Sequence, residues 1–190
     1  KFYIAFAYSF WGESGSWDQS VLWTQKAYEG KDRLPAKYQN WVGMWYACYY
    51  GKSRQDILRY WNLLEMSGIE SRLLWLDLGV TYLSYSDMYN RAVKAFKKVE
   101  EISLERGSDW KYDRYYRAYC EALLLADKPE SAIRISQKGL QIKPNDPWLI
   151  AYQGSSNVML GDTLAAGNNI SELRSFLSGN NYSKSFEELA

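Results

Sequence analysis

The sequence predicts an all-α chain of about five helix-turn-helix pairs, and three observations support this fold class. First, Trp75, Leu78 and Tyr82 fall at i, i+3 and i+7, so they line one stripe of a helix. Second, related positions recur at a constant interval along the chain. Third, helix-start signals lie between the apolar segments. Amphipathic pairs of this kind cannot bury their apolar faces alone, so we expect them to stack.

The pair at the centre of the chain covers residues 75–96. On its first helix, Gly79 leaves room for a partner helix to cross closely. On its second helix, Ala92 and Phe96 place a small contact beside a large one. These features predict two helices packed closely against each other, joined by a short turn near Tyr85.

The repeat interval is clearest in the second half of the chain. Gly154 follows Cys120 by the same interval as Ala166 follows Ala132. This interval matches the length of one helix pair in helical repeat proteins.

The central segment resembles the signature of the tetratricopeptide repeat (TPR) proteins. Its spacing is Trp75-x-x-Leu78-Gly79-x-x-Tyr82 followed by Ala92-x-x-x-Phe96. The resemblance implies a right-handed superhelical solenoid in which the first helix of each pair lines a concave groove. Residues 31–35, Lys-Asp-Arg-Leu-Pro, are also similar to the start of TPR regions in larger bacterial regulatory or signalling proteins.

We expect a single TPR-like domain over residues 1–190, with repeats at about 1–35, 36–69, 70–107, 108–146 and 147–178 and a C-terminal capping helix at 179–190. The first repeat is expected to hold helices around Phe2 to Trp11 and Asp18 to Tyr28.

Three sequence signals predict where helices start or stop. Asp127, followed by Pro129, is the expected N-cap of one helix, and Asp146 that of the next. Ser53, three residues before Asp56, opens another. The run Gly-Asn-Asn at 167–169 is a poor helix interior, so we expect the last repeat to break near Gly167.

Charge and hydropathy exclude several partners. The net charge is +1, with 23 Lys and Arg against 22 Asp and Glu, so no overall field attracts the chain to nucleic acid or to an anionic membrane. No apolar run approaches the length of a membrane span, and we expect no membrane insertion by this region. The chain begins at Lys1 without Met, which suggests an excerpt or a processed product of a larger parent.

Residue types also argue against catalysis. Histidine is absent, which removes the commonest general base and metal ligand, and there is no Cys-x-x-Cys or phosphate-binding glycine loop. We therefore expect no enzyme activity, cofactor or metal. Cys48 and Cys120 are expected to be buried free thiols in helix contacts, which favours a reducing, cytoplasmic compartment.

What remains is a binding surface on the first helices, facing away from their partner helices. On this surface we expect an aromatic ladder, then aliphatic residues, then two arginines and a tryptophan. The candidate residues are Tyr38, Trp41, Trp45, Tyr49, Leu76, Val80, Arg114, Arg117 and Trp148. Such a groove suits a peptide with an apolar part and an acidic part, in a partner protein or another domain of the parent chain.

Each candidate has a structural alternative. Trp41 and Trp45 can be core residues that pack on the first repeat. Arg114 and Arg117 can pair with Glu121 or with an acid on the preceding repeat, and Trp148 can be a hydrophobic staple. Two other functions also stay open. The ladder can stack on a glycan or another small planar ligand, or the chain can be a structural self-association module.

Overall fold

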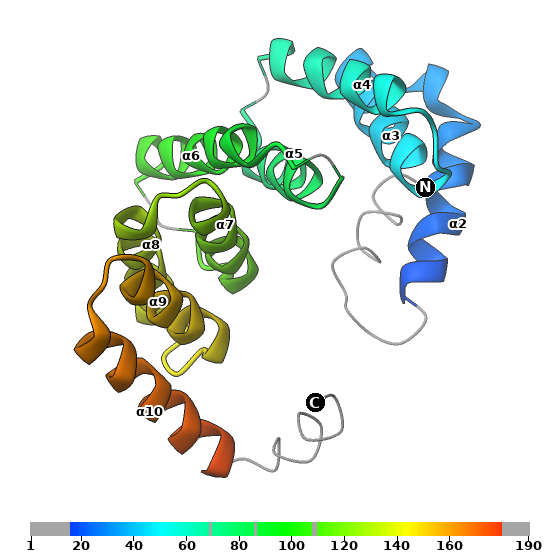
Figure 1. Ribbon diagram of the computed structural model, residues 1–190. Coiled ribbons are helices and arrows are strands. Elements are labelled where there is room, and N and C mark those ends of the chain that lie inside the picture. The colour runs from blue at the N-terminus through cyan, green and yellow to red at the C-terminus, as the bar shows by residue number, and fades with distance from the viewer. Residues whose placement is uncertain (1–15, 69, 86, 108–109, 180–190) are drawn as a thin grey trace. The chain divides into compact units, whose positions relative to one another are not determined.

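The computed structural model describes residues 16–68, 70–85, 87–107 and 110–179 (Figure 1). This part of the chain contains helices and no strand, so the predicted all-α class is confirmed. The elements are α2 (Ser16–Tyr28), a short 3-10 helix η1 (Lys31–Arg33), α3 (Ala36–Tyr49), α4 (Arg54–Met66), α5 (Arg72–Tyr85), α6 (Tyr89–Glu105), α7 (Asp113–Leu125), α8 (Pro129–Ile142), α9 (Pro147–Met159) and α10 (Thr163–Gly179). The helix expected at Phe2 to Trp11, and the cap expected at 179–190 apart from Gly179, lie outside the described residues.

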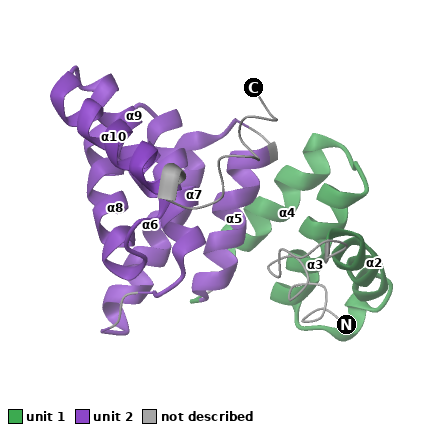
Figure 2. Cartoon of the chain, turned by 90° about the horizontal axis from the view of Figure 1, so that it is seen from below, with its two compact units in different colours: residues 1–70 green, residues 71–190 purple. Residues whose placement is uncertain are grey.

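The chain divides into two compact units, residues 1–70 and residues 71–190 (Figure 2). Unit 1 contains α2, η1, α3 and α4. Unit 2 contains the three helix pairs α5/α6, α7/α8 and α9/α10.

In unit 1, α3 is the central helix and packs against both α2 and α4. Met44 on α3 and Leu64 on α4 are fully buried. A Cβ atom at Gly43 would collide with the ring of Tyr60, so this glycine lets α4 approach α3 closely. Ser53 caps α4 as predicted, because its side chain accepts the backbone N–H of Asp56 at 3.2 Å.

In unit 2, the first helices form an inner layer and the second helices an outer layer (Figure 1). The first helices α5, α7 and α9 pack on one another more extensively than the second helices α6, α8 and α10 do. Each second helix also covers the following first helix, as α6 covers α7 and α8 covers α9. The closer spacing of the first helices puts them on the inner side of the curve of unit 2.

The central pair of unit 2 packs as its sequence predicts. Phe96 on α6 is fully buried, and its ring lies against Gly79 on α5. A Cβ atom at Gly79 would lie 2.5 Å from this ring, well inside van der Waals contact. Ala92 and Tyr82 are also fully buried. A missing side chain at Gly79 is therefore what allows the aromatic ring of Phe96 to fill the interface.

Each helix from α3 to α9 is followed within three residues by one residue with positive φ. These residues are Gly51, Gly68, Asp87, Gly107, Asp127, Asn145 and Gly161. Left-handed residues end helices because their N–H groups can bond to carbonyl groups of the last helical turn that have no partner within the helix.

The expectation that Asp127 caps α8 is wrong. Asp127 has a φ of 56° and ends α7, and α8 begins at Pro129 without a side-chain cap.

The expected break near Gly167 is also wrong, because α10 runs unbroken through this position. Packing against α9 compensates for the poor propensity of this sequence. The side-chain amide of Asn157 donates to Asn169 at 2.9 Å, and Asn169 in turn donates to Gln153 at 3.4 Å. This chain of three side-chain amides, one on α10 between two on α9, links the two helices across their interface.

One ion-pair cluster links the outer helices α6 and α8. Arg134 and Lys138 both donate to Glu100 Oε1, at 2.9 and 2.6 Å. Burial alone would raise the pKa of the Glu100 carboxyl, but the hydrogen bonds and charges of Arg134 and Lys138 together hold this pKa below its usual range. The long side chains thus bridge two second helices whose backbones are farther apart than those of the first helices.

Gly79→Ala is expected to lower the free energy of unfolding by about 1–3 kcal/mol, because the new methyl group displaces the Phe96 ring. Gly167→Ala is the matched control. Gly167 is helical with open space around it, so the same substitution there should stabilise the protein by up to about 1 kcal/mol. Thermal denaturation followed by circular dichroism compares the two, and equal effects would contradict this packing.

Glu100→Gln is expected to lower stability at pH 7 by about 0.5–1 kcal/mol, because both cations are partly exposed. Since the folded-state pKa of Glu100 is depressed, its contribution is present above the unfolded-state pKa and is lost as the pH falls through the folded value. The difference between wild type and variant should thus shrink as the pH falls below the unfolded-state pKa, and disappear below the folded-state pKa, in urea titrations at a series of pH values. A difference that persists there would assign the loss to packing.

Candidate functional site

The inner face of unit 2 has a regular register, because its first helices repeat the same positions. Leu73 on α5, Arg114 on α7 and Trp148 on α9 stand at equivalent places in the first turn of each helix. All three are exposed, Leu73 by 39% and Trp148 by 53%. A partner segment that crosses α5, α7 and α9 at this level would contact an aliphatic side chain, then a cation and then an indole.

The start of α9 is fixed by a carboxylate that is completely buried. Asp146 is 0% exposed and is the N-cap of α9, as the sequence predicts. Its Oδ1 atom accepts the backbone N–H groups of Trp148 at 3.1 Å and Leu149 at 3.4 Å. Side-chain caps of this kind satisfy donors that the first turn of a helix cannot pair internally.

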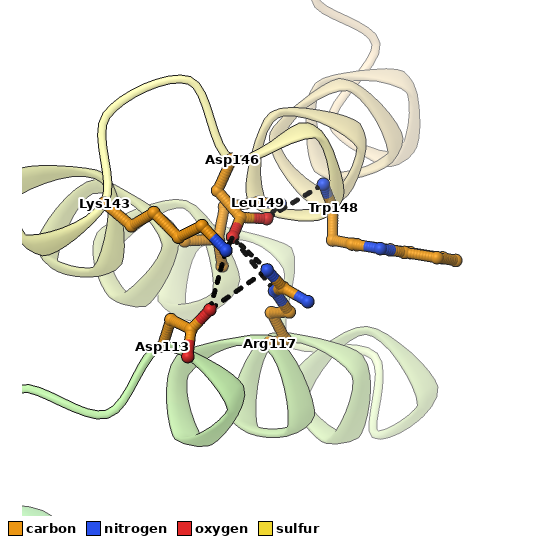
Figure 3. Close-up of polar contacts among 6 residues, drawn as sticks. All are labelled: Asp113, Arg117, Lys143, Asp146, Trp148 and Leu149. Carbon is orange, nitrogen blue, oxygen red and sulfur yellow. Dashed lines mark hydrogen bonds and ion pairs between the residues drawn. The ribbon is translucent and has the colours of Figure 1, made fainter. Parts of the chain in front are cut away.

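The second oxygen of Asp146 binds two cations (Figure 3). Arg117 on α7 donates to Oδ2 through Nε at 3.0 Å and also through Nη2, and Lys143 Nζ lies 3.5 Å from the same atom. Both cations also contact Asp113, Arg117 at 3.1 Å and Lys143 at 2.9 Å. Two cations and two carboxylates thus form a neutral cluster that joins α7, the end of α8 and the start of α9.

Asp113 occupies the partly exposed side of this cluster. Burial alone would raise the pKa of its carboxyl, but the hydrogen bond from Lys143 and the charges of Lys143 and Arg117 keep that pKa below its usual range. Asp113 is therefore ionised at neutral pH.

These contacts change the expected role of Arg117. Its guanidinium is engaged within the protein, and its acidic partners are Asp113 and Asp146, not Glu121. The contact with Asp146 is with the following helix pair, not with the preceding repeat. Arg114, one turn earlier, is exposed and remains the candidate for a charge contact with a partner.

Trp148 projects away from the charged cluster (Figure 3). It does not act as a buried staple, since about half of its side chain is exposed. Tyr152 lies one turn further along α9, on the same stripe. Burial and the charge of Glu121 raise the pKa of Tyr152 to about 12, so its hydroxyl stays protonated and can donate to Glu121.

The two predicted candidates on α5 differ in accessibility. Leu76 is 1% exposed and belongs to the core, so it is not available to a partner. Val80 is 36% exposed and lies on the same stripe as Leu73. The accessible aliphatic part of the inner face is thus made by Leu73 and Val80.

The aromatic ladder lies in unit 1, where α3 is covered on two sides. Trp41 is 6% exposed and is a core residue, and the half-buried Tyr38 stacks on it with 6.4 Å between ring centroids. Tyr49 lies 4.9 Å from the half-buried Trp45, and its hydroxyl lies 3.0 Å from Ser20 Oγ on α2. Trp17 meets Tyr49 edge to face at 4.8 Å. Most of the ladder therefore packs within the unit.

Three features of these sites were not predicted from the sequence. The ion pair between Arg117 and Asp146 spans 29 residues, and Lys143 joins it, which no local pattern indicates. Tyr152 could have been found, because it stands four residues after Trp148. Trp17, 56% exposed at the start of α2, is the most accessible aromatic side chain described in unit 1.

The cysteine prediction is confirmed for one residue. Cys120 is fully buried, and burial raises the pKa of its thiol. Cys48 is half-buried, and both are free thiols.

Among the described side chains, no group of three or more His, Cys, Asp or Glu is placed to hold a metal ion. No helix in the described ranges is both long and apolar enough to cross a membrane.

Asp146→Ala is expected to lower the free energy of unfolding by about 2–4 kcal/mol, because it removes the cap of α9 and the buried partner of Arg117. Asp146→Asn keeps the capping oxygen but replaces the oxygen that accepts from Arg117 and Lys143 with an NH2 donor, so its cost should be smaller than that of Asp146→Ala, about 1–3 kcal/mol. Urea denaturation followed by circular dichroism measures both. Equal stability of wild type and Asp146→Ala would mean that the cluster does not support the fold.

No family model matches the sequence, and no curated protein matches it either. Solved structures of MamA, a TPR-containing protein, do match. MamA AMB-1 has a TM-score of 0.67 at 15% identity, covering 97% of this chain and 95% of that one. MamA MSR-1 has a TM-score of 0.65 at 16% identity, covering 92% and 90%. Similarity at this identity shows the fold alone, and it confirms the predicted TPR-like helical solenoid.

Proposed function

We propose that this TPR-like chain is a non-enzymatic interaction scaffold and that unit 2 binds a segment of a partner protein across α5, α7 and α9. The observation that carries the proposal is the indole of Trp148. It is 53% exposed on a helix whose first turn is fixed by a buried carboxylate. Aromatic side chains on a rigid base lose little conformational freedom on binding, and they often dominate the energy of interfaces.

The inner face also suggests the chemistry of the partner segment. Leu73 and Val80 offer exposed aliphatic surface on α5, and Arg114 offers a cation on α7 between them and Trp148. A segment with apolar side chains and a carboxylate complements this order. Such a segment can belong to a separate protein or to another domain of the parent chain.

A second candidate function rests on Trp17 in unit 1. Its indole is 56% exposed and lies beside Tyr49, with 4.8 Å between ring centroids. An exposed aromatic side chain of this kind can stack on a sugar ring or another planar ligand. Titration of soluble glycans while tryptophan fluorescence is recorded would test this, and a spectral change absent from a Trp17→Ala variant would support it.

Trp148→Ala is expected to weaken peptide binding by about tenfold or more, because the exposed indole is the proposed anchor. The ligands are peptides selected by the full chain from a displayed library of random sequences, and fluorescence anisotropy gives their dissociation constants. The fold should be unaffected, because the indole projects from a helix that Asp146 caps through backbone groups.

Trp17→Ala is the matched control, because it removes an indole of similar exposure from the other unit. Binding should be unchanged in this variant. If Trp17→Ala weakened binding and Trp148→Ala did not, the interaction would belong to unit 1 and the proposal would be contradicted.

Arg114→Ala should weaken the binding of acidic peptides more than that of neutral peptides, and it should reduce the dependence of binding on salt concentration.

A further inference from the structure

A second exposed apolar surface of unit 2 lies about three helical turns from Trp148, at the C-terminal ends of α7 and α9. It is made by five large side chains at the end of α7, the end of α9, and the start of α10, which we call the turn patch. Its members and their exposures are Leu125 49%, Val158 64%, Met159 47%, Leu160 42% and Leu164 77%. Exposed apolar clusters of this kind mark interaction sites in soluble proteins.

The five side chains lie at one edge of unit 2 because α7 and α9 run side by side in the same direction. Their early turns are joined by Arg117 and Asp146, and the two helices pack on each other. Leu125 and Met159 are the last residues of α7 and α9, so they occupy equivalent places at the same end. A rise of about 1.5 Å per residue puts Met159 about 16 Å from Trp148 along α9.

The turn that carries most of the patch is well defined. Gly161 has a φ of 75°, and its N–H donates to the Val158 carbonyl at 3.0 Å. The N–H of Asp162 donates to the Asn157 carbonyl at 2.9 Å, and the Asp162 side chain caps α10 through the N–H of Ala165 at 2.9 Å. The exposure of these apolar residues is therefore a property of a rigid turn that is available for docking.

The rim of the patch is acidic. Asp127, Glu130 and Asp162 are exposed in or beside the turns after α7 and α9, and Glu121 is exposed one turn before Leu125. Lys128 is the one exposed cation of the described residues in these two turns. No ion pair within the described part of the chain neutralises these four carboxylates. The C-terminal ends of α7 and α9 add partial negative charge at the same edge.

This combination of charge and apolar surface selects the occupant. We propose that the turn patch binds a basic amphipathic helix of a partner protein, whose apolar face covers Met159 and Leu164 and whose Lys or Arg side chains meet the acidic rim. A second copy of this chain fits poorly, because a symmetric dimer would place one acidic rim against the other. The C-terminal segment 180–190 has two Glu and one Lys, so its charge does not complement the rim either.

The test uses the full chain and two labelled model peptides that form amphipathic helices, one with Lys and Leu and one with Glu and Leu. Fluorescence anisotropy should detect binding of the Lys peptide, weakening as salt rises, and no binding of the Glu peptide. The double variant Met159→Gln/Leu164→Gln should bind the Lys peptide about tenfold more weakly.

Two further variants locate the effect. Ile170→Gln removes an apolar side chain of similar exposure, 46%, from α10 outside the patch, and should bind as wild type does. Asp127→Asn/Glu130→Gln should weaken binding and reduce its salt dependence. No binding of the Lys peptide, equal binding of both peptides, or an equal loss in Ile170→Gln would each overturn the proposal. Self-association by light scattering that the double variant abolishes would also overturn it, by identifying the occupant as a second copy.

The turn patch stands independently of the proposed function of the inner face. Trp148→Ala should leave binding of the Lys peptide unchanged, and Met159→Gln/Leu164→Gln should leave binding of peptides selected on the inner face unchanged. Because each variant changes only one of the two measurements, failure of either proposal can be recognised separately.

Discussion

The buried carboxylate of Asp146 is the contact on which the second half of unit 2 depends. One of its oxygens caps α9, and the other holds Arg117 of α7 and Lys143 at the end of α8. A charge that is fully removed from water is tolerated only when it is paired and hydrogen-bonded. Because one side chain both caps α9 and pairs with α7 and α8, it constrains how the start of α9 lies against those two helices. Trp148, in the first turn of α9, is positioned by the same contacts.

Close packing around small residues complements this polar contact. Gly79 accepts the ring of Phe96, and Gly139 on α8 lies where a Cβ atom would come within 2.6 Å of Leu149 and 2.8 Å of Tyr116. Each glycine thus marks a place where a large side chain of a neighbouring helix occupies the missing volume. Together these contacts set the inner layer of first helices, in which Leu73, Arg114 and Trp148 occupy equivalent first-turn positions.

The sequence predicted the parts of the fold that depend on local pattern. Apolar spacing at helical period defines the pair α5/α6, and Ser53 and Asp146 mark helix starts through side-chain oxygens. The predictions from sequence were wrong at positions where contacts with neighbouring helices outweigh the local preference of the residues. Asn169 is satisfied by amides of α9, so α10 continues through Gly167, and Asp127 takes a left-handed conformation that only the preceding helix requires.

The candidate site was harder to predict, because helical spacing alone does not show which side chains a neighbouring helix covers. A stripe of aromatic residues at helical spacing is the same whether a helix covers it or not, so Trp41 looked equivalent to Trp45 in the sequence although it is a core residue. Arg117 has acidic partners both nearby and 29 residues away, and only the fold selects Asp146. Trp148 was a candidate because the sequence places it on a first helix, just after the predicted start at Asp146. It is exposed in the structure, and its role in binding stays a prediction.

Binding of a protein segment to the inner face of unit 2 is the central claim, and hydrogen–deuterium exchange with a library-selected peptide tests it most directly. The account predicts slower exchange of backbone amides in α5, α7 and the first turns of α9, with no change in α2 to α4. Protection confined to α2 and α3 would contradict it, because the ligand would then be bound by the aromatic side chains of unit 1.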